Sequence, residues 1–139
     1  MQQHYLISAL ANSFYQVEKV FEGLTPEQMT EKITPLAMTP DEQMEHLCEV
    51  YHAFLLTADG GTYEWGNSYS TGLSSLPEKM EFLKSQHDIV VNKTEQNPEL
   101  LGEKVCDFIL SHNGYHVGQM CLVRLNLNSD WNAYSIYNH

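Results

Sequence analysis

Hydrophobic positions recur every three or four residues in four stretches of the chain, as they do on the buried face of an amphipathic helix. Sequence signals for helix ends border these stretches. Thr39-Pro40-Asp41-Glu42 is a capping box with proline in the first turn, and Ser75 and Glu78 form a second box. The pattern predicts an all-α chain with helices over residues 6 to about 23, 40 to about 59, 76–96 and about 102–128.

The connections between these helices select an arrangement. Only a few residues around Pro98 join the third and fourth helices, which predicts antiparallel neighbours. The segment 59–75 could span on the order of 50 Å when extended, whereas a helix of this size is about 27 Å long. It can therefore return the chain to the end where the second helix began. We predict a four-helix bundle with up-down-down-up topology and a long crossover between the second and third helices.

Composition restricts the class of protein. The chain has 139 residues, 42% of them hydrophobic, which is enough for a single domain (1–139) to bury a core without disulfides. Its seven basic residues are scattered against 18 acidic ones, and a net charge of −11 argues against nucleic acid or an anionic membrane as partner. Three cysteines without a Cys-x-x-Cys pair, and no signal-peptide pattern, predict a cytoplasmic protein.

His112 and His116 lie one turn apart on the apolar face predicted for the fourth helix. This spacing brings their Cβ atoms to about 5–6 Å, so that both rings could bind one cation. The alternative is a pair of core histidines that are each hydrogen-bonded to a buried partner. Two imidazoles on one dry face, followed by the polar Gln119, favour the metal. The remaining residues of this predicted face are Val105, Phe108, Ile109, Met120, Val123 and Leu127.

The His-x-x-x-His-x-Gly-Gln pattern from His112 to Gln119, with a single His46 near the start of a capped helix, resembles the DinB/YfiT-like superfamily of metal-binding four-helix bundles. The resemblance covers nearly the whole chain. It implies that His46, His112 and His116 bind one divalent ion. From its position on the helix alone, His46 would be interpreted as an exposed histidine. His87, on the apolar face of the third helix, is either a partner of the site or a hydrogen-bonded core residue.

Three neutral imidazoles leave at least one coordination position open, as in catalytic sites. We expect Zn²⁺, with Ni²⁺, Fe²⁺ or Mn²⁺ as alternatives. The resemblance implies a metal-dependent enzyme that transfers the sulfur of a low-molecular-weight thiol to a small molecule. A metal-dependent hydrolase and a non-catalytic stress-response protein that binds metal or a small ligand are the alternatives. Glu49 and Gln119, one turn after His46 and His116, are candidates for orienting ligands or substrate, and Arg124 is expected at the surface.

The predicted crossover is longer than a connector requires, and it contains Tyr63, Trp65 and Tyr69. These aromatic side chains either form the wall of a pocket beside the metal or pack the crossover onto the bundle.

Two glycines in the fourth helix call for a close neighbour. Gly114 and Gly118 each cost about 1 kcal/mol relative to alanine, and they share the face opposite the histidines. Another helix of the same chain or a partner subunit would explain them. We expect a homodimer, as the resemblance also suggests.

Overall fold

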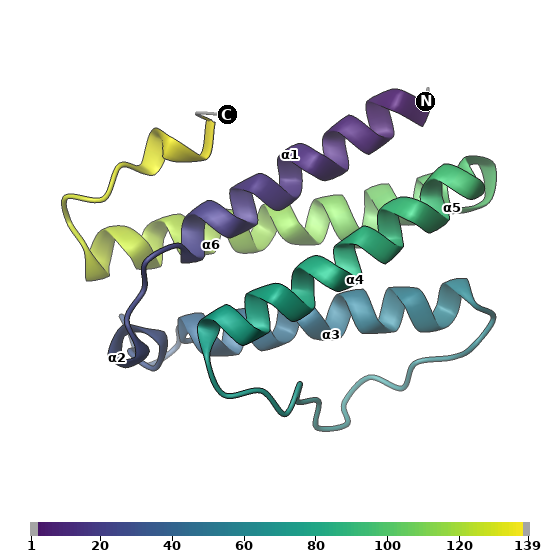
Figure 1. Ribbon diagram of the computed structural model, residues 1–139. Helices are drawn as coiled ribbons and strands as arrows, with labels where there is room; N and C mark the ends of the chain where they lie inside the picture. Colours follow the sequence, from purple (N-terminus) through teal and green to yellow (C-terminus); the bar gives the residue numbers. More distant parts are fainter. Residues whose placement is uncertain (1–2, 138–139) are drawn as a thin grey trace.

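The computed structural model describes residues 3–137, and each regular element within this range is helical, so the prediction of an all-α chain is confirmed. Four long helical runs pack into a bundle, with α1 next to α4 and α6, and α3 also next to α4 and α6 (Figure 1). None of the helices in this range is long and apolar enough to span a lipid bilayer. The elements are α1 (Gln3–Phe21), α2 (Pro26–Met29), α3 (Pro40–Ala58), α4 (Leu76–Gln96), α5 (Pro98–Lys104), the π-helical turn η1 (Val105–Leu110), α6 (Ser111–Leu127) and the 3-10 turn η2 (Ala133–Tyr137).

Local capping explains where two of the long helices begin. The hydroxyl of Thr39 accepts a hydrogen bond from the backbone N–H of Glu42 at 3.0 Å, and the Glu42 carboxylate accepts one from the backbone N–H of Thr39 at 2.9 Å. These two bonds form the capping box that the sequence predicted. At α4, Ser75 accepts from the backbone N–H of Glu78 at 3.3 Å, but the Glu78 carboxylate accepts from the Ser75 hydroxyl instead of its backbone. The second predicted box is therefore only half formed.

The fourth long run begins at Pro98, four residues earlier than predicted, and contains a π-helical turn that the sequence pattern did not indicate. A π turn holds more residues than an α turn, so it rotates the residues on either side of it relative to each other. Asn113 is consequently buried and His112 only half-buried, whereas Phe108 is 58% exposed. The prediction that Phe108 belongs to the buried face is wrong for this reason.

Arg124 lies in the interior, which contradicts the surface position expected for it. Its guanidinium group donates to the backbone carbonyl of Val20 at 3.1 Å and to the side-chain oxygen of Asn128 at 3.3 Å. It also lies against the ring of Trp131, 5.2 Å from the centroid. Val20 belongs to the last turn of α1, whose carbonyls lack partners within the helix. Arg124 therefore joins the end of α1 to the end of α6.

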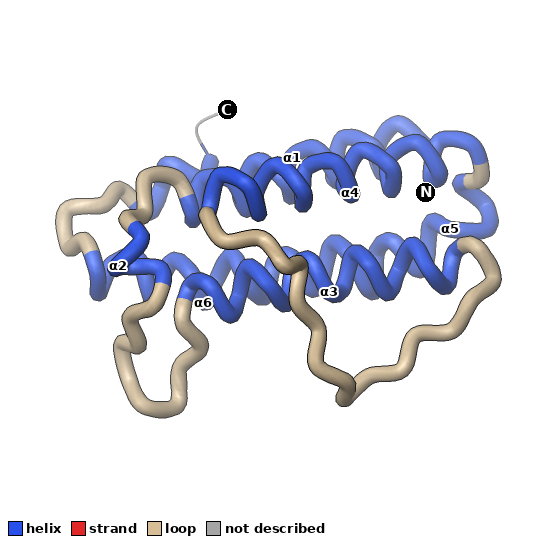
Figure 2. Tube along the Cα trace, turned by 60° about the horizontal axis from the view of Figure 1, so that its bottom comes forward, coloured by secondary structure: helices blue, strands red, loops and turns tan. Residues whose placement is uncertain are grey.

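The crossover 59–75 leaves the end of α3, passes outside that helix and reaches the start of α4 (Figure 1; Figure 2 shows it as a tan loop). The Glu45 carboxylate anchors it by accepting from the backbone N–H and the hydroxyl of Thr71, at 2.9 and 2.7 Å. Lys79, which is buried at the start of α4, forms ion pairs with Asp41 at 2.7 Å and with Glu45 at 3.1 Å. One buried ammonium group thus connects α4, α3 and the crossover.

Candidate metal centre

The bundle brings His46 of α3 together with His112 and His116 of α6. Each ring offers one nitrogen that lies within 4.8 Å of the corresponding nitrogens of the other two. The Nε2 atoms of His112 and His116 are 3.2 Å apart. Two imidazole nitrogens bound to one tetrahedral zinc ion are separated by about 3.4 Å. The three predicted ligands therefore form a group that could hold a metal ion.

Two of these rings are oriented by hydrogen bonds on the side away from the cluster. Nδ1 of His116 donates to the side-chain oxygen of Gln43 at 2.9 Å, and Nδ1 of His46 donates to the Glu49 carboxylate at 3.1 Å. Each bond holds the proton of its ring on Nδ1, which leaves the lone pair of Nε2 free to bind a metal ion. Metal-binding histidines characteristically have such a partner on the second nitrogen. Gln43 was not predicted, although its place one turn before His46 on α3 was a usable signal.

Tyr63, from the crossover, is connected to His46 through Glu49. Its hydroxyl donates to the second carboxylate oxygen of Glu49 at 2.6 Å. This hydrogen bond, together with burial, raises the pKa of Tyr63 to about 12. The Tyr63–Glu49–His46 chain places a residue of the crossover within two hydrogen bonds of a histidine of the cluster.

His112 lacks this kind of support. Its Nδ1 atom is buried and has no hydrogen-bond partner among residues 3–137. A buried polar atom without a partner costs about 1–3 kcal/mol. His112 is therefore positioned by α6 and by contact with the other two rings, 4.5 Å from the centroid of His116 and 4.9 Å from that of His46.

The two histidines of α6 are neutral at physiological pH. Burial and the nearby His46 lower the pKa of His112 to about 4. Burial, His112 and His46 lower the pKa of His116 to about 3. Neutral imidazole is the form that binds metal, so no proton competes for these nitrogens near pH 7.

His46 also reaches the surface of the protein. It lines a hollow of about 460 Å³ with several carboxylates, and this concentration of negative charge attracts divalent cations. Tyr69 lies at this hollow, together with Met38, Ser70 and Lys79, and the carboxylates are those of Asp41, Glu42, Glu45 and Glu49.

Glu49→Ala should weaken metal binding by about 10–100-fold, the usual effect of losing the hydrogen-bond partner of a ligand histidine. Competition with a chromophoric chelator measures this affinity directly. Glu81→Ala removes the same charge from an exposed position on α4 and is the matched control. Equal losses in the two variants would show that Glu49 acts only through the overall charge.

The residue after His112 anchors α6 in the core. The Asn113 side-chain amide donates to the hydroxyl of Ser13 at 3.0 Å and to that of Tyr51 at 2.9 Å. The Tyr51 hydroxyl in turn forms a hydrogen bond with Nδ1 of His87 at 3.2 Å. His87 also stacks on Phe14, and burial lowers its pKa to about 4. His87 is thus a hydrogen-bonded core residue that belongs to a different network from the three-histidine cluster.

Two further polar side chains, those of Gln119 and Cys48, have surroundings that restrict their chemistry. The side-chain amide of Gln119, a candidate for orienting a ligand or substrate, donates to the Tyr115 hydroxyl at 2.7 Å. Cys48 is fully buried, and burial together with the nearby Glu45 raises its pKa to about 12. Its thiol therefore stays protonated and is a packing group.

The cluster combines three converging imidazole nitrogens with an acidic hollow that His46 lines, and Gln43 and Glu49 orient two of its rings. Comparisons of the chain with protein-family models, with curated proteins and with solved structures gave no match.

Proposed function

We propose that His46, His112 and His116 bind one divalent metal ion, and that the protein is a metal-dependent enzyme acting on a small molecule. The observation that carries this proposal is the convergence of three imidazole nitrogens within 4.8 Å of one another. We expect Zn²⁺, with Ni²⁺, Fe²⁺ or Mn²⁺ as alternatives, because imidazole suits several of these ions. Three protein ligands leave at least one position for a substrate.

The leading reaction is transfer of sulfur from a low-molecular-weight thiol to an electrophilic carbon. A divalent ion in this site supplies Lewis acidity, which lowers the pKa of a thiol that reaches its open position. In the transfer an S–C bond forms and the bond between carbon and the leaving group breaks. The leaving group takes the electron pair and the thiol proton goes to solvent. Because Cys48 is buried and protonated, the sulfur comes from the substrate and not from this thiol.

Hydrolysis is the second candidate, because a divalent ion in this site would also lower the pKa of a water molecule at its open position. A protein that binds metal or a small ligand in a stress response, without catalysis, is the third. The resemblance to the DinB/YfiT-like superfamily supports the enzymatic candidates. We propose the up-down-down-up order as well, and the directions of the helices support it, because in Figure 1 α1 and α6 run one way and α3 and α4 the other.

The test is metal analysis of protein purified without a nickel column, followed by a screen of thiols with electrophiles and of simple esters and amides. We expect a near-stoichiometric divalent ion, and turnover that a chelator abolishes and added metal restores. Stoichiometric metal without turnover would favour the binding protein, and absence of metal would overturn the whole proposal.

We also infer that the protein forms a homodimer in the cytoplasm through the exposed face of α6. Gly114 and Gly118 are exposed, and apart from the adjoining residues and backbone of α6 no atom of residues 3–137 lies within 4 Å of a Cβ atom built on either. A neighbouring helix of residues 3–137 therefore does not explain these glycines. Tyr115 and Leu122 on the same helix are 60% and 61% exposed, which provides apolar area for a second copy.

Gly118→Leu should shift the protein toward monomer in sedimentation velocity, because a leucine side chain would hold the two helices apart. The free α6 has room for it and gains helix propensity of up to about 1 kcal/mol, so thermal stability of the monomer should not fall. Ser85→Leu adds the same side chain to an exposed position of α4 as a control. An unchanged sedimentation profile for Gly118→Leu would contradict this interface.

A further inference from the structure

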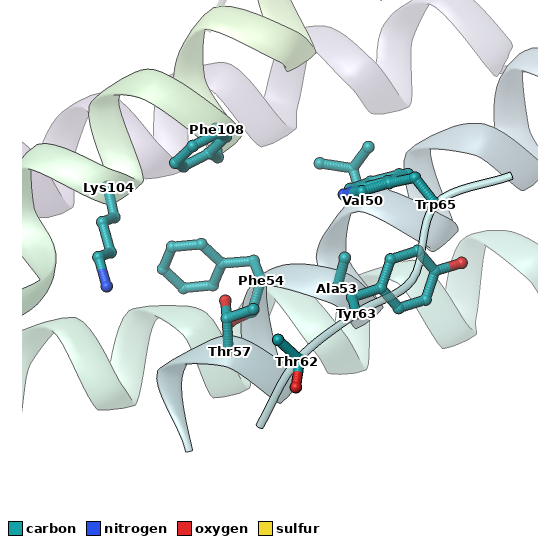
Figure 3. Close-up of a pocket in the computed structure, with 9 residues that line it drawn as sticks. All are labelled: Val50, Ala53, Phe54, Thr57, Thr62, Tyr63, Trp65, Lys104 and Phe108. Carbon is teal, nitrogen blue, oxygen red and sulfur yellow. The ribbon is translucent and has the colours of Figure 1, made fainter. Parts of the chain in front are cut away.

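A groove with a mainly apolar lining lies between α3, the crossover and the run formed by α5 and η1. Its volume is about 310 Å³, and its walls include the rings of Phe54, Phe108, Tyr63 and Trp65 (Figure 3). Trp65 and Phe108 are each 58% exposed, so both have an open face toward the solvent. Large exposed aromatic rings beside a concave surface are typical of ligand sites. We call this surface the α3–η1 groove.

The groove adjoins the metal centre. Val50 lines it and follows His46 by four residues on α3, and Phe108, in the π turn before α6, lines its other side. Residues with this spacing are neighbours along a helix, with Cβ atoms about 5–6 Å apart. Tyr63 also lines the groove, and its hydroxyl leads through Glu49 to His46. A molecule in the groove would thus lie about one helical turn from His46.

Lys104 is the one charged side chain among the described residues that line the groove. Figure 3 shows it at one end, near Phe54 and Phe108, with Trp65 and Tyr63 at the other. Within residues 3–137, no hydrogen bond or ion pair engages its ammonium group, whereas Lys79 and Lys93 are paired with aspartates. In a chain with a net charge of −11, a cation beside an apolar groove selects for a ligand with one negative charge.

We propose that the α3–η1 groove binds a small aromatic carboxylate. Its ring would lie between Phe108, Phe54 and Trp65, and its carboxylate would lie at Lys104. The volume is at the lower end of the range of roughly 300–1,000 Å³ for ligand pockets, which requires a small molecule. The opposite end of this ligand faces Tyr63 and the metal centre. The role of this carboxylate as a substrate rests on the proposed function, whereas its binding in the groove does not.

The test compares two probes that differ only in charge, 3-phenylpropionate and the neutral 3-phenylpropionamide, by titration followed by NMR. Wild-type protein should bind the carboxylate about fivefold more tightly than the amide, the effect of one partly exposed ion pair. Lys104→Met should remove that difference, and Lys84→Met, on the exposed side of α4, should keep it. Equal affinity for both probes, no binding of either, or equal effects of the two lysine variants would overturn the proposal.

Trp65→Ala separates a ligand site from packing. We expect the affinity for both probes to fall about tenfold while the melting temperature changes little, because a ring that is 58% exposed adds little to the core. A large drop in melting temperature with unchanged affinity would mean that Trp65 only packs the crossover. If Trp65→Ala and Lys104→Met instead alter sedimentation and leave probe affinity unchanged, a second copy covers the groove. Either of these two results, Trp65 as a packing residue or a second copy over the groove, would overturn the proposal.

The same titrations on chelator-treated protein distinguish the groove from the metal centre. If the protein binds the probes but is found to bind no metal, the groove is supported and the proposed function is overturned. Stoichiometric metal in protein that binds neither probe would leave the metal centre intact and overturn the groove.

Discussion

His116→Ala should abolish stoichiometric binding of a divalent ion at neutral pH. His116 is 1% exposed, and Gln43 holds its Nδ1 at 2.9 Å, so it is the most firmly positioned of the three candidate ligands. Losing a partner of a ligand weakens metal binding by about 10–100-fold. Losing a ligand should weaken it further, because His46 and His112 alone leave the ion mainly to water. His46→Ala and His112→Ala should act in the same direction.

Metal content is measured by mass spectrometry on protein purified without a nickel column. His52→Ala is the matched control, because His52 is an exposed histidine of α3 that packs against Tyr63 and Tyr69 outside the cluster. His116→Gln keeps most of the buried volume and guards against a loss of metal caused by unfolding, which far-UV circular dichroism would reveal. Wild-type metal content in folded His116→Ala or His116→Gln would rule out the proposed ligand set.

Lys79→Ala should give a large loss of stability, about 3 kcal/mol in the free energy of unfolding. The substitution leaves the carboxylates of Asp41 and Glu45 close together without the ammonium group that bridges them at 2.7 and 3.1 Å. Glu45 also anchors Thr71, so the crossover should become more mobile. Urea denaturation measures the first effect, and faster amide hydrogen exchange in residues 69–73 would report the second.

Lys84→Ala is the control for Lys79→Ala, because it removes an exposed lysine from the same helix. A surface substitution of this kind usually changes stability by less than about 0.5 kcal/mol. Similar unfolding free energies for the two variants would mean that the bridge formed by Lys79 contributes no more than a surface lysine.

The elements that the sequence predicted well are those whose signals are local. The three- to four-residue period of apolar positions and the Thr39 capping box predicted the starts of α1 and α3 within a few residues. Both depend on neighbours within one helical turn. The spacing of His112 and His116 is also a local signal, since it is a property of one helix.

Only the tertiary structure decided which of these residues are buried and what they contact. The π turn η1 rotates α6, which places Asn113 in the core and turns Phe108 toward a groove. Arg124 and Lys79 are buried because their partners, Val20 and Asp41, come from other helices.

The candidate site follows the same division. The sequence by itself determined that two imidazoles face one side of a helix, and the resemblance selected His46. The partner of His116, Gln43, is 73 residues away along the chain, and Tyr63 reaches Glu49 from the crossover. These contacts depend on how α3, α6 and the crossover pack against one another. No periodicity or spacing within a single helix encodes them, because such patterns specify which face is apolar but not which atoms that face meets.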